Sequence, residues 1–334
     1  MIRDGTVFDD DHLPREIVGR NSHMNEVTTA LAPIEQGEQA ENCFLFGPSG
    51  VGKTTVARAS VRELRKEVLE VPYAYVNCWQ NYTKNAVLMC LAQDLVDAAV
   101  ARNASNRQLT KTIHQQLDSP GVVILDEVDQ LAETEVLYDL HQISGISWIA
   151  VANREIDLFA GLEDRIHSRM SVGFRVTFRQ YDDDTITDIL ERRAREGLGS
   201  NVVSRDVLAR IARLSEGDAR TAITALRVAA RKAAQNGLLS IPVRIVEESI
   251  LAAGQEVRQK TISKLNQHQR VIFEVLESEG ALIQKELYER YSEQHDDPVT
   301  LRYLRQKHLP KLEHYGLVET ERNGSGKLYA LTKF

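Results

Sequence analysis

Residues 47–54 follow the spacing of a phosphate-binding loop: a glycine, four further residues, a second glycine, a lysine and a threonine. The glycines allow backbone amides to close around phosphate oxygens, and the N-terminus of a following helix adds the positive end of its dipole. Lys53 is expected to neutralise the β- and γ-phosphates, and Thr54 to ligate Mg²⁺. The pattern therefore predicts ATP or ADP with Mg²⁺, held by Gly47, Pro48, Ser49, Gly50, Val51, Gly52, Lys53, Thr54 and Thr55.

A pair of carboxylates follows an apolar run further along the chain. Residues 122–125 lead directly into Asp126 and Glu127. In a parallel sheet the end of such a run lies at the same edge as the phosphate loop. Asp126 is therefore expected to hold Mg²⁺ through its water shell, and Glu127 to orient and deprotonate the attacking water. The alternative is a pair of solvated acids that cap a strand, which the phosphate loop makes the weaker interpretation.

The elements that must position these residues indicate an α/β fold. Up to about residue 180, short apolar runs of strand length alternate with amphipathic helical patterns; the runs are 43–46, 73–76, 122–125 and 148–151. This alternation predicts a parallel sheet covered by helices on both faces. We expect it to form a nucleotide-binding base domain over residues 12–180.

Two further units are predicted after the base domain. Residues 181–258 carry no strand pattern but contain helix starts at Ser204, Asp218 and Pro242, so they are expected to form a helical lid domain. Residues 262–334 begin with helical patterns and end in a predicted hairpin, whose turn contains two glycines.

The series of motifs resembles that of the AAA+ ATPases. In that group a polar residue reads the γ-phosphate from the end of the strand that follows the acidic pair, and Asn153 matches it. A second reader is an arginine in the first turn of a lid helix, and Arg220 matches it beyond the capping residue Asp218. A solvated surface arginine is the alternative interpretation of Arg220.

The resemblance also implies an arginine that completes the nucleotide site of a neighbouring subunit. Residues 162–170 resemble that motif, with Arg169 as the first candidate and Arg165 as the second. Either arginine could instead pair with Glu163 or Asp164.

Within this group the chain resembles the archaeal replication initiators related to the origin recognition complex and to the cell-division-control helicase loader. The likeness is carried, in order, by residues 13–20, 47–54, 76–78, 125–131, 137–140, 165–170 and 215–220. It implies that Val18 and Tyr181 contact the nucleotide, and that ATP hydrolysis is slow and serves as a switch. Arg154, directly after Asn153, departs from the family pattern, as do the short connections after residues 131 and 178.

The C-terminal unit has the element order of a winged helix-turn-helix, with three helical patterns followed by a hairpin. Asp297 and Pro298 are expected to begin the third helix, and Pro310 to interrupt it. A third helix of this kind enters the major groove, so the predicted partner is double-stranded DNA, with contacts from Arg302, Arg305, Lys307, Lys311, Arg322 and Lys327. The alternative is a small module that packs on the lid or on a protein partner.

Composition limits the remaining classes. The chain has 334 residues, of which 43% are hydrophobic, and a formal net charge of −7, values typical of a soluble protein with two or three packing units. Its apolar runs are shorter than the roughly 20 residues that span a bilayer, and its N-terminus lacks the pattern of a secretory signal. Three cysteines without metal-ligand spacing indicate reduced thiols. We therefore expect a cytoplasmic protein associated with the nucleoid and not with a membrane.

Together these features predict a weak ATPase that binds a replication origin, self-associates on DNA and helps to recruit the replicative helicase. Two alternatives remain open at this point. One is a transcriptional regulator that uses the same ATP switch, and the other is an assembly or signalling ATPase whose winged helix binds protein.

Overall fold

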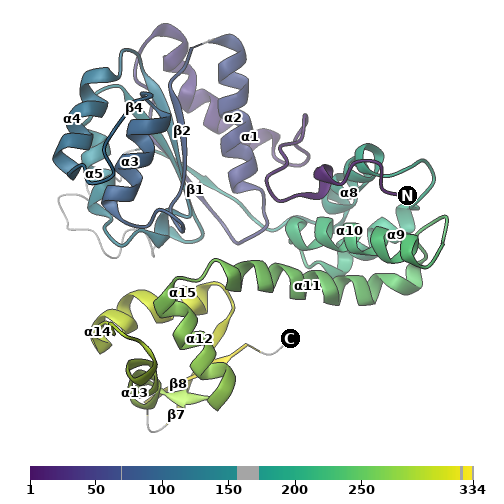
Figure 1. The fold of residues 1–334 in the computed structure, drawn as a ribbon. Coiled ribbons are helices and arrows are strands. Elements are labelled where there is room, and N and C mark those ends of the chain that lie inside the picture. The colour runs from purple at the N-terminus through teal and green to yellow at the C-terminus, as the bar shows by residue number, and fades with distance from the viewer. Residues whose placement is uncertain (69, 156–172, 324–325, 333–334) are drawn as a thin grey trace. The chain divides into compact units, whose positions relative to one another are not determined.

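The structure is a computed structural model that describes residues 1–68, 70–155, 173–323 and 326–332 (Figure 1). The chain divides into two compact units, residues 1–254 and residues 255–334. The boundary falls inside one long helix, α11 (Val246–Ser263).

The first unit is built on a five-stranded parallel sheet in the order β2-β3-β4-β1-β5. Its strands are β1 (Cys43–Phe46), β2 (Tyr73–Asn77), β3 (Gly121–Asp126), β4 (Ile146–Ala152) and β5 (Phe174–Thr177). The predicted parallel sheet is confirmed. The edge strand β5 was missed because only Val176 of its four residues is buried, so it lacks the continuous apolar run that marks the other strands.

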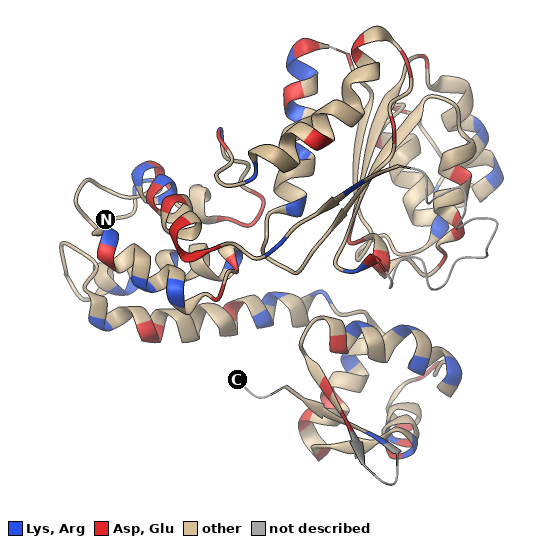
Figure 2. Ribbon diagram, turned by 180° about the vertical axis from the view of Figure 1, so that it is seen from behind, with Lys and Arg blue, Asp and Glu red and all other residues tan. Residues whose placement is uncertain are grey.

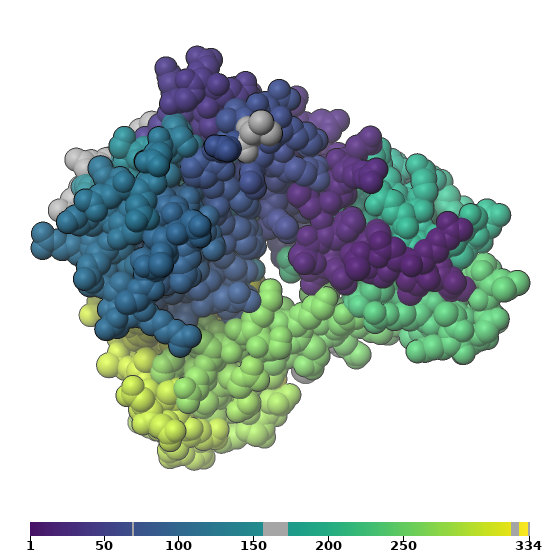
Figure 3. Space-filling model, turned by 45° about the horizontal axis from the view of Figure 1, so that its top comes forward, coloured from purple at the N-terminus to yellow at the C-terminus, as the bar shows by residue number. Residues whose placement is uncertain are grey.

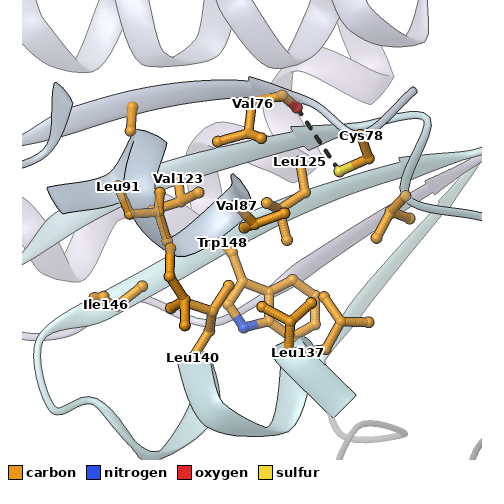
Figure 4. Close-up of a cluster of buried hydrophobic side chains, with 14 of the residues drawn as sticks. Val76, Cys78, Val87, Leu91, Val123, Leu125, Leu137, Leu140, Ile146 and Trp148 are labelled. Atoms are coloured by element: carbon orange, nitrogen blue, oxygen red, sulfur yellow. Dashed lines mark hydrogen bonds between the residues drawn. The ribbon is translucent and has the colours of Figure 1, made fainter. Parts of the chain in front are cut away.

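Successive side chains of each strand face two separate cores. Phe44 and Val123 point to the side of α3, α4 and α5, where Trp148 fills the centre of the cluster (Figure 4). Leu45 and Ile124 point to the opposite side, where α1 and α2 cover the sheet. These helices are α1 (Asn21–Leu31), α2 (Lys53–Glu67), α3 (Lys84–Asp94), α4 (Asn106–Gln116) and α5 (Glu135–Gln142), with the short turns η2 (Ala32–Gln36) and η3 (Val128–Gln130) between them. The sheet is therefore buried on both faces, which explains why its central strands are apolar throughout.

A helical lid follows the sheet within the same unit. Its helices are α8 (Asp183–Gly197), α9 (Arg205–Leu214) and α10 (Ala219–Gln235), followed by η4 (Val243–Ile245) and the first part of α11. Asp182, Ser204 and Asp218 each cap a helix by accepting a hydrogen bond from the third backbone amide beyond the cap. The starts predicted at Ser204 and Asp218 are confirmed.

The N-terminal segment completes the lid core, which the sequence patterns did not indicate. Val7 and Phe8, at the end of the short turn η1 (Thr6–Phe8), are buried among the apolar side chains of the lid helices. Arg193 of α8, itself nearly buried, donates to the Val7 carbonyl at 2.7 Å. In Figure 3 this segment lies over the lid. Burial of Phe8 alone contributes about 2 kcal/mol of hydrophobic stabilisation.

The same segment also contacts the helix that begins at the phosphate loop. Arg58 of α2 donates to the Asp11 carbonyl at 3.0 Å, and Arg62 donates to the carbonyl of Pro14 at 2.7 Å. Glu16 then forms an ion pair with Arg192 of α8. Residues 1–16 therefore contact both the base domain and the lid.

The second unit contains α12 (Gln267–Glu279), β6 (Leu282–Ile283), α13 (Gln284–Gln294), α14 (Leu301–Tyr303), the π-turn η5 (Leu304–His308), α15 (Leu309–His314), β7 (Val318–Asn323) and β8 (Gly326–Leu331). The three strands form an antiparallel sheet in the order β6-β8-β7. Three helical segments followed by a hairpin is the predicted element order.

The predicted start of the third helical segment was wrong. The helix begins at Leu301 instead of Pro298, because the Thr300 hydroxyl accepts a hydrogen bond from the Tyr303 amide and caps it. The Asp297 amide donates to the His295 ring at 3.0 Å and belongs to the preceding turn. The preference of proline for the first helical position was therefore overridden by Thr300, a second capping residue three positions after Asp297.

Pro310 lies where the third segment changes geometry. The Leu309 amide donates to the Leu304 carbonyl, five residues earlier, so the backbone widens into a π-turn before α15 begins. Proline has no amide to donate and breaks a helix interior, but it is tolerated in a first turn, and Pro310 lies in the first turn of α15. The predicted interruption near Leu309 is confirmed.

Candidate nucleotide site

The phosphate loop joins the buried strand β1 to α2. Gly50 and Gly52 have φ angles of 72° and 86°, which lie in the left-handed region that favours glycine. A Cβ atom at Gly52 would lie 2.6 Å from the Tyr181 hydroxyl, and one at Gly50 would lie 2.1 Å from the Asp218 carboxylate. Both positions therefore require glycine, for the left-handed backbone and for the space that a Cβ would fill. The Asp218 carboxylate beside Gly50 belongs to the lid, so the lid reaches the loop here.

Lys53 lies inside the loop with only 8% of its surface exposed. Its ammonium group donates to the carbonyls of Gly47 at 2.6 Å and Pro48 at 2.7 Å, and to Asn153 Oδ1 at 2.7 Å. These three acceptors match the three donors of an ammonium group. The structure thus brings Lys53 and Asn153 together, as a shared phosphate site requires.

Burial lowers the pKa of Lys53 to about 8. The negative charge of Asp126 acts in the opposite direction, and the positive charge of Arg220 lowers the pKa further. A buried ammonium at the centre of the loop favours an anionic partner, because it lacks the water that would stabilise its charge.

Asp126 accepts hydrogen bonds on both carboxylate oxygens and is only 7% exposed. The Thr54 hydroxyl lies 3.1 Å from each oxygen, and the Glu127 amide donates to Oδ1 at 3.1 Å. The Tyr75 hydroxyl donates to Oδ2 at 2.7 Å. Thr54 and Asp126 therefore converge as predicted, whereas the contribution of Tyr75 was missed because its partner is 51 residues away.

Glu127 occupies an unusual backbone position directly after β3. Its φ and ψ angles are 54° and 44°, in the left-handed region, which costs a non-glycine residue about 1 kcal/mol. This conformation begins the short turn η3 and turns the chain away from the sheet. The side chain is half-buried beside Asp126, at the carboxyl edge of the sheet.

The lid contacts the phosphate loop through the first turn of α10. The Ala219 amide donates to the Gly50 carbonyl at 3.1 Å, while Asp218 caps the helix through the Thr221 amide at 3.0 Å. Arg220 follows these two residues and is exposed. Because its charge acts on Lys53, the lid arginine lies within electrostatic range of the loop lysine.

Arg20 joins the loop to the segment that leads into the lid. It is buried, and its guanidinium donates to the carbonyls of Val51 at 3.0 Å and Arg179 at 2.7 Å. It also stacks 3.8 Å from the centroid of the Tyr181 ring. Val18, two residues earlier, is half-buried. The individual role of Arg20 was missed, since its partners are backbone carbonyls that no side-chain pattern predicts.

The two candidates for a trans-acting arginine, Arg165 and Arg169, lie outside the described residues. Arg154, the departure from the family pattern, is exposed just beyond Asn153. None of the helices in the described ranges is long and apolar enough to cross a membrane.

The predicted DNA contacts fall on the third helical segment and the hairpin of the second unit, where Figure 2 shows lysines and arginines along the helices. Arg302 and Arg305 are exposed, as is Lys327 in β8, while Lys307 and Lys311 are half-buried. The backbone of Arg322 belongs to β7 and pairs with that of Lys327; its side chain lies outside the described part of the chain.

A cluster of three histidines includes His308, which lies on the same segment as Arg305 and Lys307. The His268 ring stacks on His295, with centroids 4.1 Å apart, and lies 5.1 Å from His308. Both ring nitrogens of His308 are buried without a hydrogen-bond partner among the described residues. Burial, followed by the charge of the neighbouring His268, lowers the pKa of His308 to about 3. His308 is therefore neutral at physiological pH.

The sheet order, the phosphate loop after β1, the carboxylates after β3 and the helical lid define an AAA+ ATPase. Family comparison agrees with this class. Residues 36–158 match the AAA domain family, and residues 187–253 match the Cdc6 AAA+ ATPase-type lid domain.

Known relatives extend the match to nearly the whole chain. ORC1-type DNA replication protein 9 of Halobacterium salinarum is 37% identical over 333 residues, which cover 99% of this chain and 94% of the relative. ORC1-type DNA replication protein 1 of the same organism is 37% identical over 311 residues, covering 91% and 100%. The solved structure of the Aeropyrum pernix ORC1 protein in complex with DNA has a TM-score of 0.78 and 26% identity, covering 99% and 93%.

This chain therefore belongs to the family of ORC1-type DNA replication proteins, and the predicted resemblance is confirmed.

Proposed function

We propose that this chain is an ATP-dependent replication initiator that binds duplex DNA at an origin and helps to recruit the replicative helicase. The observation that carries the proposal is the convergence of Lys53, Asn153 and the Arg220-bearing turn of α10 around one phosphate loop. A lid that contacts the loop directly gives bound nucleotide a way to act on the rest of the chain.

Each residue of the site has a distinct role in this proposal. Lys53 and Asn153 hold the terminal phosphates, and Arg220 reads the γ-phosphate from the lid. Val18 and Tyr181 contact the base side of the nucleotide. Glu127 orients the attacking water and accepts its proton.

The oxygen donors at the start of α2 and at the end of β3 fit Mg²⁺. Thr54 supplies a hydroxyl oxygen and Asp126 a carboxylate, and the two groups meet within 3.1 Å, beside the loop. Hard oxygen donors of this kind are the ligands that Mg²⁺ prefers, and one or two of them suffice when phosphates and water complete the shell. The ion would neutralise charge on the phosphates when it is bound.

The lid contact supports a switch in preference to a motor. The Ala219–Gly50 hydrogen bond joins the lid to the loop at one backbone pair, so the identity of the nucleotide can bias the lid angle. Hydrolysis is slow in this proposal, because it needs an arginine from a neighbouring subunit, Arg169 or Arg165. Self-association on DNA brings that arginine into place.

The second unit is proposed to act as a winged helix. Arg302 and Arg305 extend into solvent from the third helical segment, in position to contact base edges or phosphates. Further contacts to the DNA backbone come from Lys307, Lys311, Arg322 and Lys327. The solved ORC1 relative in complex with DNA supports duplex DNA as the partner. A protein bound to genomic DNA is associated with the nucleoid in this proposal.

Footprinting on genomic DNA tests the proposal. Wild-type protein with ATP is expected to protect a replication origin, whereas Lys53→Ala should lose the nucleotide dependence of that footprint. Lys66→Ala, an exposed lysine of the same helix, is the matched control and should behave as wild type. Protection of promoters without an origin would point instead to transcriptional regulation, and no protection at all would contradict the DNA half.

A further inference from the structure

Tyr75 is the one hydroxyl donor on the neighbouring strand that reaches Asp126 among the described residues. In the parallel pairing of β2 with β3, Tyr75 lies opposite Ile124, and Asn77 lies opposite Asp126. The tyrosine side chain therefore extends two residues along the sheet to place its hydroxyl 2.7 Å from Asp126 Oδ2. A shorter side chain at this register would not reach the carboxylate.

This hydrogen bond fixes one of the two oxygens of Asp126. The Glu127 amide donates to Oδ1, Tyr75 donates to Oδ2, and the Thr54 hydroxyl is equally distant from both. With one donor fixed on each oxygen, rotation of the carboxylate would break one of the two bonds. The remaining lone pairs of both oxygens are therefore held toward Thr54 and the phosphate loop.

The Tyr75 hydroxyl donates to the carboxylate, which accepts. Burial, followed by the negative charge of Asp126, raises the pKa of Tyr75 well above its ordinary value. Arg58 lies 5.8 Å from the ring centroid and helps to hold the ring in place.

We infer that Tyr75 is a positioning residue that orients the Asp126 carboxylate toward the metal of a bound Mg²⁺–nucleotide. The inference rests on the proposed role of Asp126 as a Mg²⁺ ligand. Mg²⁺ demands near-ideal octahedral geometry, so a carboxylate that is free to rotate binds the coordination shell of the ion less well. Loss of a hydrogen bond to a metal-binding side chain typically weakens metal affinity by about 10-fold to 100-fold.

The same strand offers a matched control. Tyr73 is also half-buried, two residues earlier on the same face of β2, and its ring lies 5.9 Å from Arg65, just as Tyr75 lies near Arg58. Among the described residues, the hydrogen bonds to the Asp126 carboxylate come from Tyr75, Thr54 and the Glu127 amide, and Tyr73 is not one of these donors. Tyr75→Phe and Tyr73→Phe therefore remove the same atom from similar surroundings, and only the first change removes a donor to the carboxylate.

The test measures ADP affinity of the full chain by calorimetry, first in EDTA and then across a MgCl₂ titration. Tyr75→Phe should bind ADP as wild type does in EDTA, but should need about tenfold more Mg²⁺ to reach its full affinity. Tyr73→Phe should match wild type under both conditions.

Three results would overturn the inference. A normal Mg²⁺ requirement in Tyr75→Phe would show that the bond does not orient the carboxylate. Weaker ADP binding in EDTA as well, or a lowered melting temperature without nucleotide, would show that Tyr75 only maintains the fold. If wild type and Asp126→Asn respond equally to Mg²⁺, the proposed role of Asp126 itself fails, and that outcome is distinct from failure of Tyr75 alone.

Discussion

The nucleotide site and the third helical segment of the second unit both collect cations, but they hold them in opposite ways. Lys53 is buried and donates to three acceptors supplied by the chain itself. Arg302 and Arg305 extend into solvent, on the segment that also carries the buried, neutral His308. In the first region the protein fixes the geometry of the charge before any ligand arrives, whereas in the second the partner must order flexible side chains on binding.

This difference predicts different energetics. A buried charge interacts strongly, because little water screens it, and its removal should weaken binding by a large factor in one step. Exposed cations act additively and are screened by salt, so their removal should weaken binding gradually. Mutations in the two regions test this contrast directly.

The largest effect is expected at Lys53. Lys53→Ala should weaken ATP affinity by roughly 100-fold, since loss of a charged hydrogen-bonded group costs up to about 3 kcal/mol. Titration of a fluorescent ATP analogue measures the change, with Lys66→Ala as the exposed control on the same helix. A loss below fivefold would mean that the buried lysine does not contact the phosphates.

A smaller and salt-dependent effect is expected on the third segment. The double variant Arg302→Ala/Arg305→Ala should lower DNA affinity roughly 30-fold, at about 1 kcal/mol for each exposed charged contact. It should also reduce the slope of log affinity against log salt by about 1.8, because each phosphate contact contributes about 0.9.

Gel-shift titration at several salt concentrations measures both quantities. Arg290→Ala is the control, because that arginine of α13 is also exposed but is paired with Glu279 and Glu293. An unchanged salt slope in the double variant would contradict the proposed phosphate contacts.

The pKa of Lys53 predicts how binding depends on pH. Below about pH 8 the free protein already carries the charged lysine, so ADP affinity should be constant. Above that pH binding requires proton uptake, and affinity should fall by about tenfold for each pH unit. Adenosine, which lacks phosphates, provides the control and should bind equally across the range. An ADP affinity that stays flat to pH 9.5 would contradict this linkage.

Stability should change in the opposite direction over the same window. An unfolded lysine titrates near about pH 10.4, so between pH 8 and that value the unfolded state binds more protons than the folded state. The contribution of Lys53 to the free energy of unfolding therefore rises with pH while nucleotide affinity falls. Thermal unfolding without nucleotide would show whether the two curves diverge.

The last effect concerns the stability of the second unit and is expected at His308, on the same segment as the exposed cations. Its folded pKa lies below its ordinary value of 6.5, so the unfolded state binds the extra proton and stability is lost as pH falls below 6.5. His308→Phe should make the chain more acid-resistant by roughly 2 kcal/mol between pH 7 and 5.

Chemical denaturation at the two pH values measures this effect, with the half-buried His314→Phe as the control. Equal acid sensitivity of wild type and His308→Phe would show that the buried His308 ring does not contribute to the loss of stability at low pH. Such a result would also mean that acid sensitivity of a buried ring is not one of the differences between the second unit and the nucleotide site.

The parts of the molecule that could be predicted share a local cause. Gly47 to Thr54 form one continuous pattern, and Asp126 and Glu127 directly follow an apolar run, so spacing alone indicated their chemistry. The caps at Ser204 and Asp218 were equally local, since each side chain satisfies an amide three residues away.

The parts that could not be predicted depend on partners distant in the sequence. Tyr75 resembles any other strand residue until β2 is paired with β3, and Arg20 donates to carbonyls 31 and 159 residues away. The N-terminal segment contributes Phe8 to the lid core although Phe8 precedes Ile186, the first lid residue of that core, by 178 positions. The edge strand β5 is a strand only because β1 provides its pairing edge.

The sequence by itself therefore determined the phosphate loop and the acidic pair, because the spacing of their residues is dictated by a ligand of fixed size and charge. Tertiary structure alone decided how the loop is supported. The contact of Lys53 with Asn153, the donation of Tyr75 to Asp126 and the amide of Ala219 on Gly50 all arise from strands and helices that meet only after folding. Hydrogen bonds between distant residues leave no periodic trace in the chain, since their geometry is set by sheet register and packing.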